Sequence, residues 1–406
     1  MKTIDIIGKE TLKAQVDAVL GEIIAIRRDL HAHPELSQQE VRTSAKISEY
    51  LTEWQIPHRT EVAGHGIVGL IGGKISRRSG GPVIAVRADM DALPIQEKND
   101  VPYRSLNEGV MHACGHDIHT AVLLGAAKIL KGMEDELPGT VKLLFQPAEE
   151  TVGGALPMIR AGCLKDPDVN AVIGLHVDPD IPAGHLEFCR GSMNAASNEF
   201  TITVTGVSCH GAHPHNGVDA ILAASQVVNA LQSVAARSVA ATDAAVVTVG
   251  LFQAGTAPNV LAGKAVLKGI VRTLDPATRS LAVRRVAEIA EATAAAYGAA
   301  AQVDFTESYP ALINDDQVET ILEGAAASFF NREQIHFQPK PSMGAEDFSY
   351  FCSAVKGAYF NIGTRSLPEG PSAPLHSEYY CPDERCISAG VLMEIAGVLA
   401  LMEKLD

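Results

Sequence analysis

Residues 141–150 read VKLLFQPAEE, a short apolar run followed by a proline and two adjacent glutamates. Two further apolar runs, residues 83–86 (VIAV) and residues 171–175 (AVIGL), are as short and carry no charge. Runs of this kind are typical of strands that are buried on both faces. An Ala- and Leu-rich stretch at residues 119–132 has the period of a helix and separates two of the runs. Strands that alternate with helices predict an α/β domain with a largely parallel sheet.

Polar side chains follow each of these strands at the point where the apolar run ends. Glu149 and Glu150 follow one strand, and Asp89 closes the Arg-Ala-Asp sequence after another. His176 comes directly after the third run. In open α/β sheets, functional sites gather outside the carboxyl ends of the strands. We therefore expect these side chains to lie in one site.

A second pattern begins near residue 199, with strands and helices in the order β-α-β-β-α-β. The strands are predicted at residues 199–205, 245–251, 264–272 and 303–307, and the helices at residues 219–236 and 277–297. This order is that of a ferredoxin-like module. We expect residues 195–308 to form such a module, inserted into a discontinuous domain made of residues 1–194 and 309–406. That first domain would also contain helices at residues 11–30, 43–55 and 386–404.

Composition and charge narrow the class of protein. The chain has 406 residues, of which 47% are hydrophobic, as in a globular enzyme of two or three domains. A net charge of −15 argues against nucleic acid or an anionic membrane as a partner. No apolar stretch is long enough for a signal peptide or for the ~18 residues of a membrane span, so we expect a cytoplasmic protein. Its seven cysteines would be free thiols or metal ligands.

The sequence His112-Ala113-Cys114-Gly115-His116 is a candidate metal site. Cys114 and His116 would point to one face of an extended segment. Thiolate and imidazole are the usual ligands of zinc-like ions. Judged from these residues alone, a buried cysteine beside solvent-facing histidines is an equally good interpretation.

The Glu149-Glu150 pair favours the metal interpretation. Adjacent side chains at a strand end diverge, so one carboxylate can bind an ion while the other takes a proton from water. The alternative is a solvated acidic turn. His176 and His376 are further candidate ligands by residue type, but spacing alone cannot place His376 in the site.

Five segments of the chain together resemble the di-metal amidohydrolase family of aminoacylases, carboxypeptidase G and hippurate hydrolase. The resemblance is closest to the branch of hippurate hydrolases and plant auxin-conjugate hydrolases. The segments are residues 87–94 (RADMDALP), 112–120 (HACGHDIHT), 145–150 (FQPAEE), 174–176 (GLH) and 343–348 (MGAEDF). They are spread over most of the chain in the order of the family. Residues 28–35 (RDLHAHPE) also look like the family, without a chemistry that we can assign.

The resemblance implies two divalent ions per chain, which could be zinc, manganese, cobalt or nickel. The implied ligands are Cys114, shared by both ions, with Glu150 and His376 at one ion and His116 and His176 at the other. Glu149 would be the general base and acid, and Asp89 would orient a ligand. Arg87 stands where aminoacylase-type members carry a histidine ligand. Because arginine cannot bind a metal, His116 would replace that ligand.

The inserted module also carries residues that resemble functional residues of the family. His210, in the sequence SCHGAHPH, resembles a histidine that crosses a dimer interface and stabilises the oxyanion on the attacked carbonyl. Asn259, Arg272 and Gly344 resemble residues that hold the substrate, and a guanidinium suits a carboxylate. Without the resemblance, His210 and His213 would be interpreted as exposed loop residues and Arg272 as a charge on a strand face.

The activity that the resemblance implies is hydrolysis of an N-acyl amino acid, of the N-acetyl or N-benzoyl type, by a metal-bridging hydroxide. The products would be a carboxylate and a free amino acid, and the enzyme would be a homodimer or a dimer-based oligomer. A dipeptidase or carboxypeptidase of the same family is the alternative, because no motif fixes the acyl pocket. A non-catalytic metal-binding or scaffold protein of the same fold is a third possibility. Glu149 argues against it, since a structural site needs no base.

Overall fold

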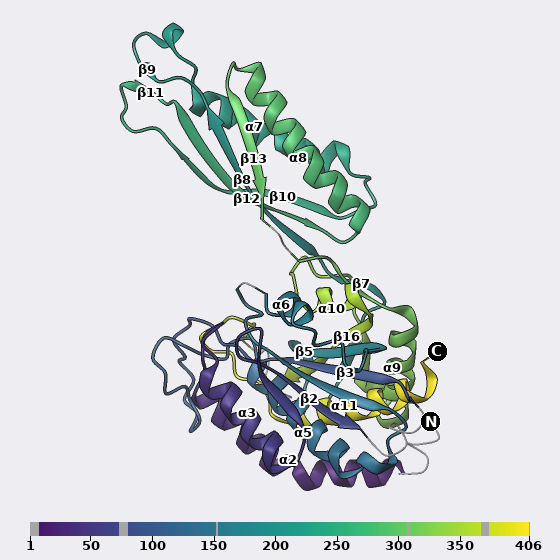
Figure 1. Ribbon diagram of the computed structural model, residues 1–406. Helices are drawn as coiled ribbons and strands as arrows, with labels where there is room; N and C mark the ends of the chain where they lie inside the picture. The colour runs from purple at the N-terminus through teal and green to yellow at the C-terminus, as the bar shows by residue number, and fades with distance from the viewer. Residues whose placement is uncertain (1–7, 73–79, 152, 307–308, 367–372, 406) are drawn as a thin grey trace. The chain divides into compact units, whose positions relative to one another are not determined.

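The computed structural model describes residues 8–72, 80–151, 153–306, 309–366 and 373–405. The chain divides into two compact units (Figure 1). Unit 1 is Met1–Gly191, Ile313–Pro339 and Tyr350–Asp406, and unit 2 is Ser192–Leu312 and Lys340–Ser349. The longer segment of unit 2, Ser192–Leu312, spans the predicted inserted module of residues 195–308, and Lys340–Ser349 joins it. The short strands β7 (Gly191–Asn194) and β14 (Leu312–Asn314) lie where the chain passes between the units.

Unit 1 is built on an eight-stranded mixed sheet with the order β1-β2-β4-β3-β5-β16-β6-β15. Its strands are β1 (His58–Val62), β2 (Gly66–Gly72), β3 (Val83–Asp89), β4 (Thr140–Gln146), β5 (Ala171–Pro182), β6 (Leu186–Phe188), β15 (Ile335–Phe337) and β16 (Lys356–Arg365). The four neighbouring strands β4, β3, β5 and β16 are parallel. Antiparallel pairs join β2 to β4 and β6 to β16. The edge pair of β6 and β15 is parallel as well. The sheet is therefore mixed, with most of its neighbouring strands parallel, as expected.

Helices pack on the sheet of unit 1. They are α2 (Lys9–Ala32), α3 (Val41–Glu53), α5 (His116–Gly132), α6 (Ala155–Arg160), α9 (Asp316–Phe329), α10 (Ser349–Ala354) and α11 (Arg385–Lys404), with 3-10 turns at Glu134–Glu136 and Arg332–Gln334. At Gly125 of α5, an added Cβ would lie 2.8 Å from Val391 of α11 and 3.2 Å from Ile23 of α2. Glycine therefore lets three helices approach closely. By length and composition α11 could cross a membrane, but 89% of its apolar window is buried, as in a core helix.

The alternation of side chains along the strands places polar residues on the sheet face opposite this core. Val86 and Ala88 of β3 belong to the buried core, so Arg87 points to the other face. Leu175 and Val177 of β5 also belong to the core. The face opposite this core therefore carries Arg87 of β3 and His176 of β5.

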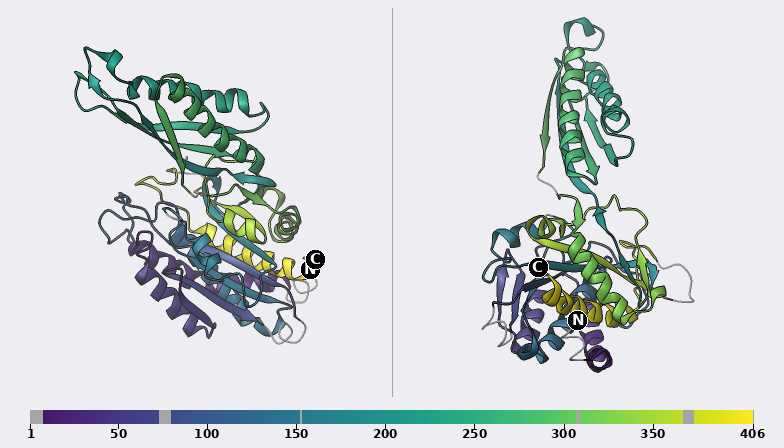
Figure 2. Two further views of the ribbon diagram at one scale, coloured as in Figure 1. Left: turned by 45° about the horizontal axis from the view of Figure 1, so that its top comes forward. Right: turned by 90° about the vertical axis from the view of Figure 1, so that its right-hand side faces the viewer.

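Unit 2 contains an antiparallel four-stranded sheet with the order β10-β12-β8-β13. Its main elements are β8 (Ala196–Thr205), α7 (Ala220–Ser233), β10 (Ala245–Ala254), β12 (Lys264–Thr273), α8 (Pro276–Ala296) and β13 (Ala300–Phe305), with a π-helical turn at Val234–Ser238. Helices α7 and α8 lie on one face of the sheet and form a separate core with it (Figure 2). The short strands β9 (Cys209–His210) and β11 (Val260–Leu261) pair with each other, and a 3-10 turn covers Pro214–Asn216. The strand predicted at residues 303–307 is β13, and Glu307 lies outside the described residues.

Asp219 and Asp275 begin the two helices of unit 2. The carboxylate of Asp219 accepts the backbone N–H groups of Ile221 and Leu222, and that of Asp275 accepts the N–H of Thr278. Pro276 fills the first helical position of α8, where its missing N–H costs nothing. Such N-caps satisfy backbone donors that have no partner inside the helix.

Candidate metal centre

Cys114 and His116 come together through a left-handed turn. The sequence suggested an extended segment here, and this expectation was wrong. Gly115 between them has φ of 81°, and α5 begins at His116. A Cβ at Gly115 would lie 2.6 Å from Cγ2 of Val177, so both the space and the backbone angle require glycine. The turn ends the loop and starts the helix in one step, with Cys114 before the turn and His116 after it.

The other predicted ligands reach the site from three separate segments. Glu150 lies in the turn after β4, as its position after the apolar run predicts. His176 does not end its strand, because β5 continues to Pro182. His376 arrives from a distant loop, where its backbone N–H donates to the carbonyl of Ala113 at 2.9 Å. That contact places the His376 ring beside the cysteine.

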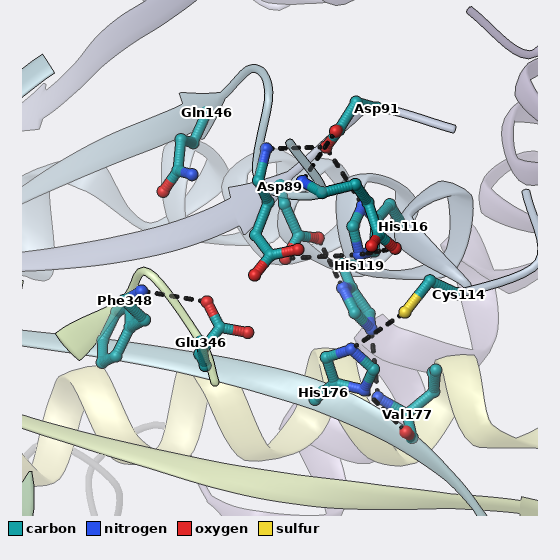
Figure 3. A network of polar contacts seen from close by, with 12 residues as sticks. Asp89, Asp91, Cys114, His116, His119, Gln146, His176, Val177, Glu346 and Phe348 are labelled. Atoms are coloured by element: carbon teal, nitrogen blue, oxygen red, sulfur yellow. Dashed lines mark hydrogen bonds and ion pairs between the residues drawn. The ribbon is translucent and has the colours of Figure 1, made fainter. Parts of the chain in front are cut away.

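Two groups of possible ligand atoms share the Cys114 sulfur. One group is Cys114, His116 and His176, and the other is Cys114, Glu150 and His376, with all ligand atoms of a group within 4.8 Å of one another. The Cys114 Sγ lies 3.4 Å from Nε2 of His176 (Figure 3) and 3.3 Å from Nε2 of His376. His376 Nε2 is also 3.4 Å from Oε1 of Glu150. The structure thus brings all five predicted ligands into one cluster.

Two atoms of this cluster are buried and lack a hydrogen-bond partner among the described residues. They are Nε2 of His116 and Oε1 of Glu150. A buried polar atom without a partner is costly, and a cation would satisfy both of these lone pairs. Sulfur, nitrogen and oxygen donors in this combination suit zinc-like ions. The residues therefore fit a pair of divalent cations.

The surroundings of the cluster raise the pKa of one ligand and lower the pKa of another. Burial raises the pKa of the Cys114 thiol well above its ordinary value. A bound cation would reverse this effect, because a coordinating thiol loses its proton. Burial also tends to raise the pKa of Glu150, but the imidazole of His376, 3.4 Å from its Oε1, and the charge of His116 lower that pKa overall. Glu150 is therefore an ionised carboxylate ready to bind a cation.

Asp89 lies behind the cluster and contacts two basic side chains. Its Oδ1 is 2.6 Å from Nδ1 of His119 (Figure 3). Its Oδ2 is 2.6 Å from Nη1 of Arg87. The N–H of Val177 donates to Nε2 of His119, so Nδ1 of His119 must carry the proton that Asp89 accepts. Despite complete burial, the charges of Arg87 and His116 and the hydrogen bond from His119 keep the pKa of Asp89 low. Arg87, which cannot bind a metal, thus supports the carboxylate instead.

Sequence reasoning missed two residues of the site, His119 and Asp91. His119 lies three residues after His116 on α5, a spacing that places both on one helix face. Their ring centroids are 5.3 Å apart. Asp91 Oδ1 lies 3.2 Å from Nδ1 of His116. Both residues stood in the quoted motifs, but neither is a metal ligand by the family pattern, and only their contacts identify them.

The predicted residues of the inserted module and of the 343–348 segment all belong to unit 2. His210 is exposed in β9 and pairs with Val260 of β11. The N–H of Gly211 donates to the carbonyl of Asn259 at 2.8 Å, so His210 and Asn259 are neighbours. Gly344 lies in a loop, where its N–H donates to Oγ of Ser342 at 3.0 Å.

Arg272 lies at the other end of the small sheet from His210. It is half-buried in β12, paired with Ser197 of β8, and its Nη1 is buried without a hydrogen-bond partner among the described residues. Strand β12 starts at Lys264, directly after the β9–β11 pair, and Arg272 is its next-to-last residue. At about 3.3 Å per residue, roughly 25 Å separates Arg272 from the His210 end. One copy of unit 2 therefore cannot place His210 and Arg272 on the same small molecule.

Comparison with known proteins identifies relatives over nearly the whole chain. A family model described as peptidase family M20/M25/M40 matches residues 85–397. The chain is 41% identical over 356 residues to an N-acetyl-L-cysteine deacetylase of Bacillus subtilis, covering 88% of this chain and 83% of the relative. It is 37% identical over 390 residues to thermostable carboxypeptidase 2 of Saccharolobus solfataricus, covering 94% and 96%.

One solved structure shares the fold of this chain and a substantial part of its sequence. It is the Bacillus subtilis YXEP protein, described as a dinuclear metal binding peptidase. The TM-score is 0.83 and the identity 34%, with 96% of this chain and 100% of the other covered. Over nearly its whole length, the chain thus shares the fold of a dinuclear metal binding peptidase.

Proposed function

Because the chain belongs to peptidase family M20/M25/M40 and is therefore a metal-dependent hydrolase, we propose that it cleaves the amide bond of N-acyl amino acids. The family resemblance seen in the sequence is confirmed by these matches. The observation that carries the proposal is the pair of ligand groups sharing Cys114, with Glu149 beside them. The named activity of the deacetylase relative supports the substrate class. We also propose a cytoplasmic location.

Glu149 has the position that a general base needs. Its carboxylate lies within 4.8 Å of ligand atoms of His116 and Glu150, and the residue is only 9% exposed. Two divalent ions (zinc, manganese, cobalt or nickel), when bound, would lower the pKa of a water to about 7 and polarise the amide carbonyl. Glu149 would take the proton of that water and return it to the leaving amine. The neighbouring Glu150 would stay ionised and hold an ion, while Asp89 orients the cluster from behind.

Arg272 is the proposed anchor of the substrate carboxylate. Its buried Nη1 has no partner among the described residues, and burial lowers its pKa. A carboxylate would satisfy this donor by a charge-assisted hydrogen bond. Gly344 is proposed to line the same substrate site. Asn259 cannot share that carboxylate within one chain, because it lies beside His210 at the far end of the sheet.

We therefore propose that His210 and Asn259 serve the site of a second copy of the chain. His210 would stabilise the oxyanion that forms on the attacked carbonyl. The exposed apolar side chains of α7 and β10 support a homodimer. They are Ile221 and Leu222 of α7 and Val246 and Phe252 of β10, with 38–48% of each residue exposed. β10 is the edge strand of its sheet, and an exposed apolar edge favours pairing with another copy.

A carboxypeptidase or dipeptidase activity is the second candidate. The similarity to a thermostable carboxypeptidase favours it. Both reactions would use the same cluster and the same base, and they differ only in the group that carries the carbonyl. Substrate choice therefore separates them, and the geometry of the cluster does not.

The test is a comparison of N-acetyl amino acids, N-benzoyl amino acids and dipeptides with metal-loaded protein. We expect hydrolysis of the N-acyl amino acids with the largest kcat/KM. Glu149→Ala should lower kcat by about 10²–10⁴-fold, because a positioned base contributes about that much. The variant should keep its metal content, as measured by elemental analysis. A wild-type kcat in Glu149→Ala would contradict the proposed role, and a preference for dipeptides would favour the second candidate.

A further inference from the structure

Asp91 is a buried carboxylate whose two oxygens each accept two hydrogen bonds. Oδ1 lies 3.2 Å from Nδ1 of His116 and 3.1 Å from the backbone N–H of Glu149. Oδ2 lies 2.7 Å from the hydroxyl of Ser37 and 3.1 Å from the backbone N–H of Glu150. Asp91 is only 1% exposed. One side chain therefore touches a predicted metal ligand and the backbone of both glutamates.

The turn that carries the glutamates needs acceptors of this kind. Strand β4 ends at Gln146, and Ala148 has φ of 58°, in the left-handed region that non-glycine residues rarely adopt. The N–H of Ala148 donates to Oε1 of the buried Glu40 at 2.8 Å, and the next two N–H groups donate to Asp91. Successive N–H groups around a left-handed residue form a concave site for an anion. Two carboxylates thus hold three consecutive backbone donors that have left the strand.

The same carboxylate also fixes His116. A ring nitrogen that donates to a carboxylate leaves the other nitrogen with its lone pair available for a metal. Nδ1 faces Asp91, so Nε2 is left for the cation, and Nε2 is the buried atom without a partner. Asp91 thereby sets the ring of His116 and the backbone of Glu149 and Glu150 in one fixed arrangement.

We propose that Asp91 is a second positioning residue of this site, beside Asp89, and that it orders the base and two metal ligands at once. The inference rests on the proposed function for the role of Glu149, but its effect on metal binding does not depend on any substrate. Ser37, two residues after the RDLHAHPE segment, anchors Asp91 from the N-terminal part of the chain. Ser37 thereby connects the chain next to the RDLHAHPE segment to the site.

Asparagine at position 91 is the sharpest test because it keeps the shape and changes the hydrogen bonding. The amide offers one acceptor oxygen, and its NH₂ group would face two donors. Calorimetry of zinc binding to metal-free Asp91→Asn should show affinity lowered about 10–100-fold at the site that contains His116. With the metal-loaded enzyme, kcat should fall by about the same factor while KM changes little. The visible spectrum of the cobalt-loaded protein should also change, since His116 is no longer fixed.

Two further variants control the experiment. Asp315→Asn alters a carboxylate that likewise accepts two backbone N–H groups, at Gln317 and Val318 of α9, without a contact to the cluster. It should leave zinc affinity, kcat and the cobalt spectrum unchanged. Ser37→Ala removes one of the four donors to Asp91 and should weaken zinc binding by about 3-fold.

The outcomes separate this inference from the proposed function. Wild-type zinc affinity and kcat in Asp91→Asn would overturn it. Lowered zinc affinity, together with a wild type that hydrolyses none of the substrates, would support Asp91 and contradict the proposed activity. If Asp91→Asn does not fold, Ser37→Ala decides: weaker zinc binding supports the inference, and unchanged binding overturns it.

Discussion

The candidate residues of unit 1 and unit 2 differ in how firmly the protein holds them. Asp89 and His116 are fully buried, and each contacts several charged neighbours. His210 and Asn259 are exposed, and the imidazole of His210 accepts one backbone N–H, from Ala212. A buried charge must be paired with partners of fixed geometry, whereas an exposed side chain needs none. Unit 1 therefore holds its candidate cation ligands in a fixed arrangement, and unit 2 carries groups that are open to a ligand or to another chain.

This difference has consequences that experiments can separate. Substitutions in the cluster of unit 1 should change metal binding itself. Substitutions in unit 2 should leave the metal content intact and change only turnover or substrate affinity. A substitution in unit 2 that lowers the metal content, or one in the cluster that leaves metal binding unchanged, would contradict this difference between the units.

Cys114→Ser should have the largest effect. Because both ligand groups use its sulfur, its loss should lower the content from about two ions per chain and reduce activity roughly 10³-fold or more. Cys209→Ser alters a half-buried thiol of unit 2 and serves as the matched control, with metal content unchanged. Elemental analysis and kcat/KM check both. A wild type that holds a single tight ion would contradict a shared Cys114.

Mixing two inactive variants tests the open residues of unit 2. His210→Ala and Glu149→Ala should each be inactive alone, but a mixed dimer would contain one intact site. With random assortment of equal amounts, half of the dimers are mixed, so about 25% of wild-type activity should return. Activity measured after exchange of subunits, with mixed dimers shown by differential tagging, gives the answer. No recovery in mixed dimers would mean that His210 acts within its own chain or not at all.

Much of unit 1 could be predicted from the sequence because its signals are local. An apolar run followed by Glu149-Glu150 places both residues at a strand end without any tertiary knowledge. His376 could not be placed this way, since it reaches Cys114 only through a backbone hydrogen bond to Ala113. Asp91 was equally hidden, because its importance lies in what it accepts and not in its residue type. Local patterns predict where a chain turns, but not which distant groups meet there.

Arg272→Ala should affect substrate affinity alone. Loss of a guanidinium that pairs with a carboxylate should raise KM for N-acyl amino acids by roughly 100-fold, with metal content unchanged. Amides that lack the carboxylate should be hydrolysed equally by both proteins. Arg237→Ala, at an exposed position of the same unit, is the control and should behave as wild type. Equal KM values for wild type and Arg272→Ala would contradict the proposed anchor.

The smallest effect on activity comes from a substitution that changes the pH dependence of stability. We expect this pH dependence from a buried carboxyl group of unit 1 and not from an exposed one of unit 2. Glu319 of α9, in unit 1, is buried, with Oε1 accepting the N–H of Cys189 at 2.9 Å and Oε2 without a partner among the described residues. Burial raises the pKa of Glu319 to about 8. Because the pKa is higher in the folded state, protonation of Glu319 stabilises the fold. This stabilisation is fully present below the pKa of the unfolded chain, near pH 4.5. That contribution is lost as the pH rises through about 8.

Glu319→Gln imitates the protonated side chain at every pH. Its free energy of unfolding should be close to that of the wild type at pH 5 and should exceed it at pH 9, as measured by urea unfolding. Activity should not change, because Glu319 contacts no ligand of the cluster. Glu291→Gln, exposed on α8 of unit 2, should show no difference at either pH. A difference between Glu319→Gln and wild type that stays constant with pH would show that Glu319 does not titrate in this range, and the pH response of unit 1 would then need another buried group.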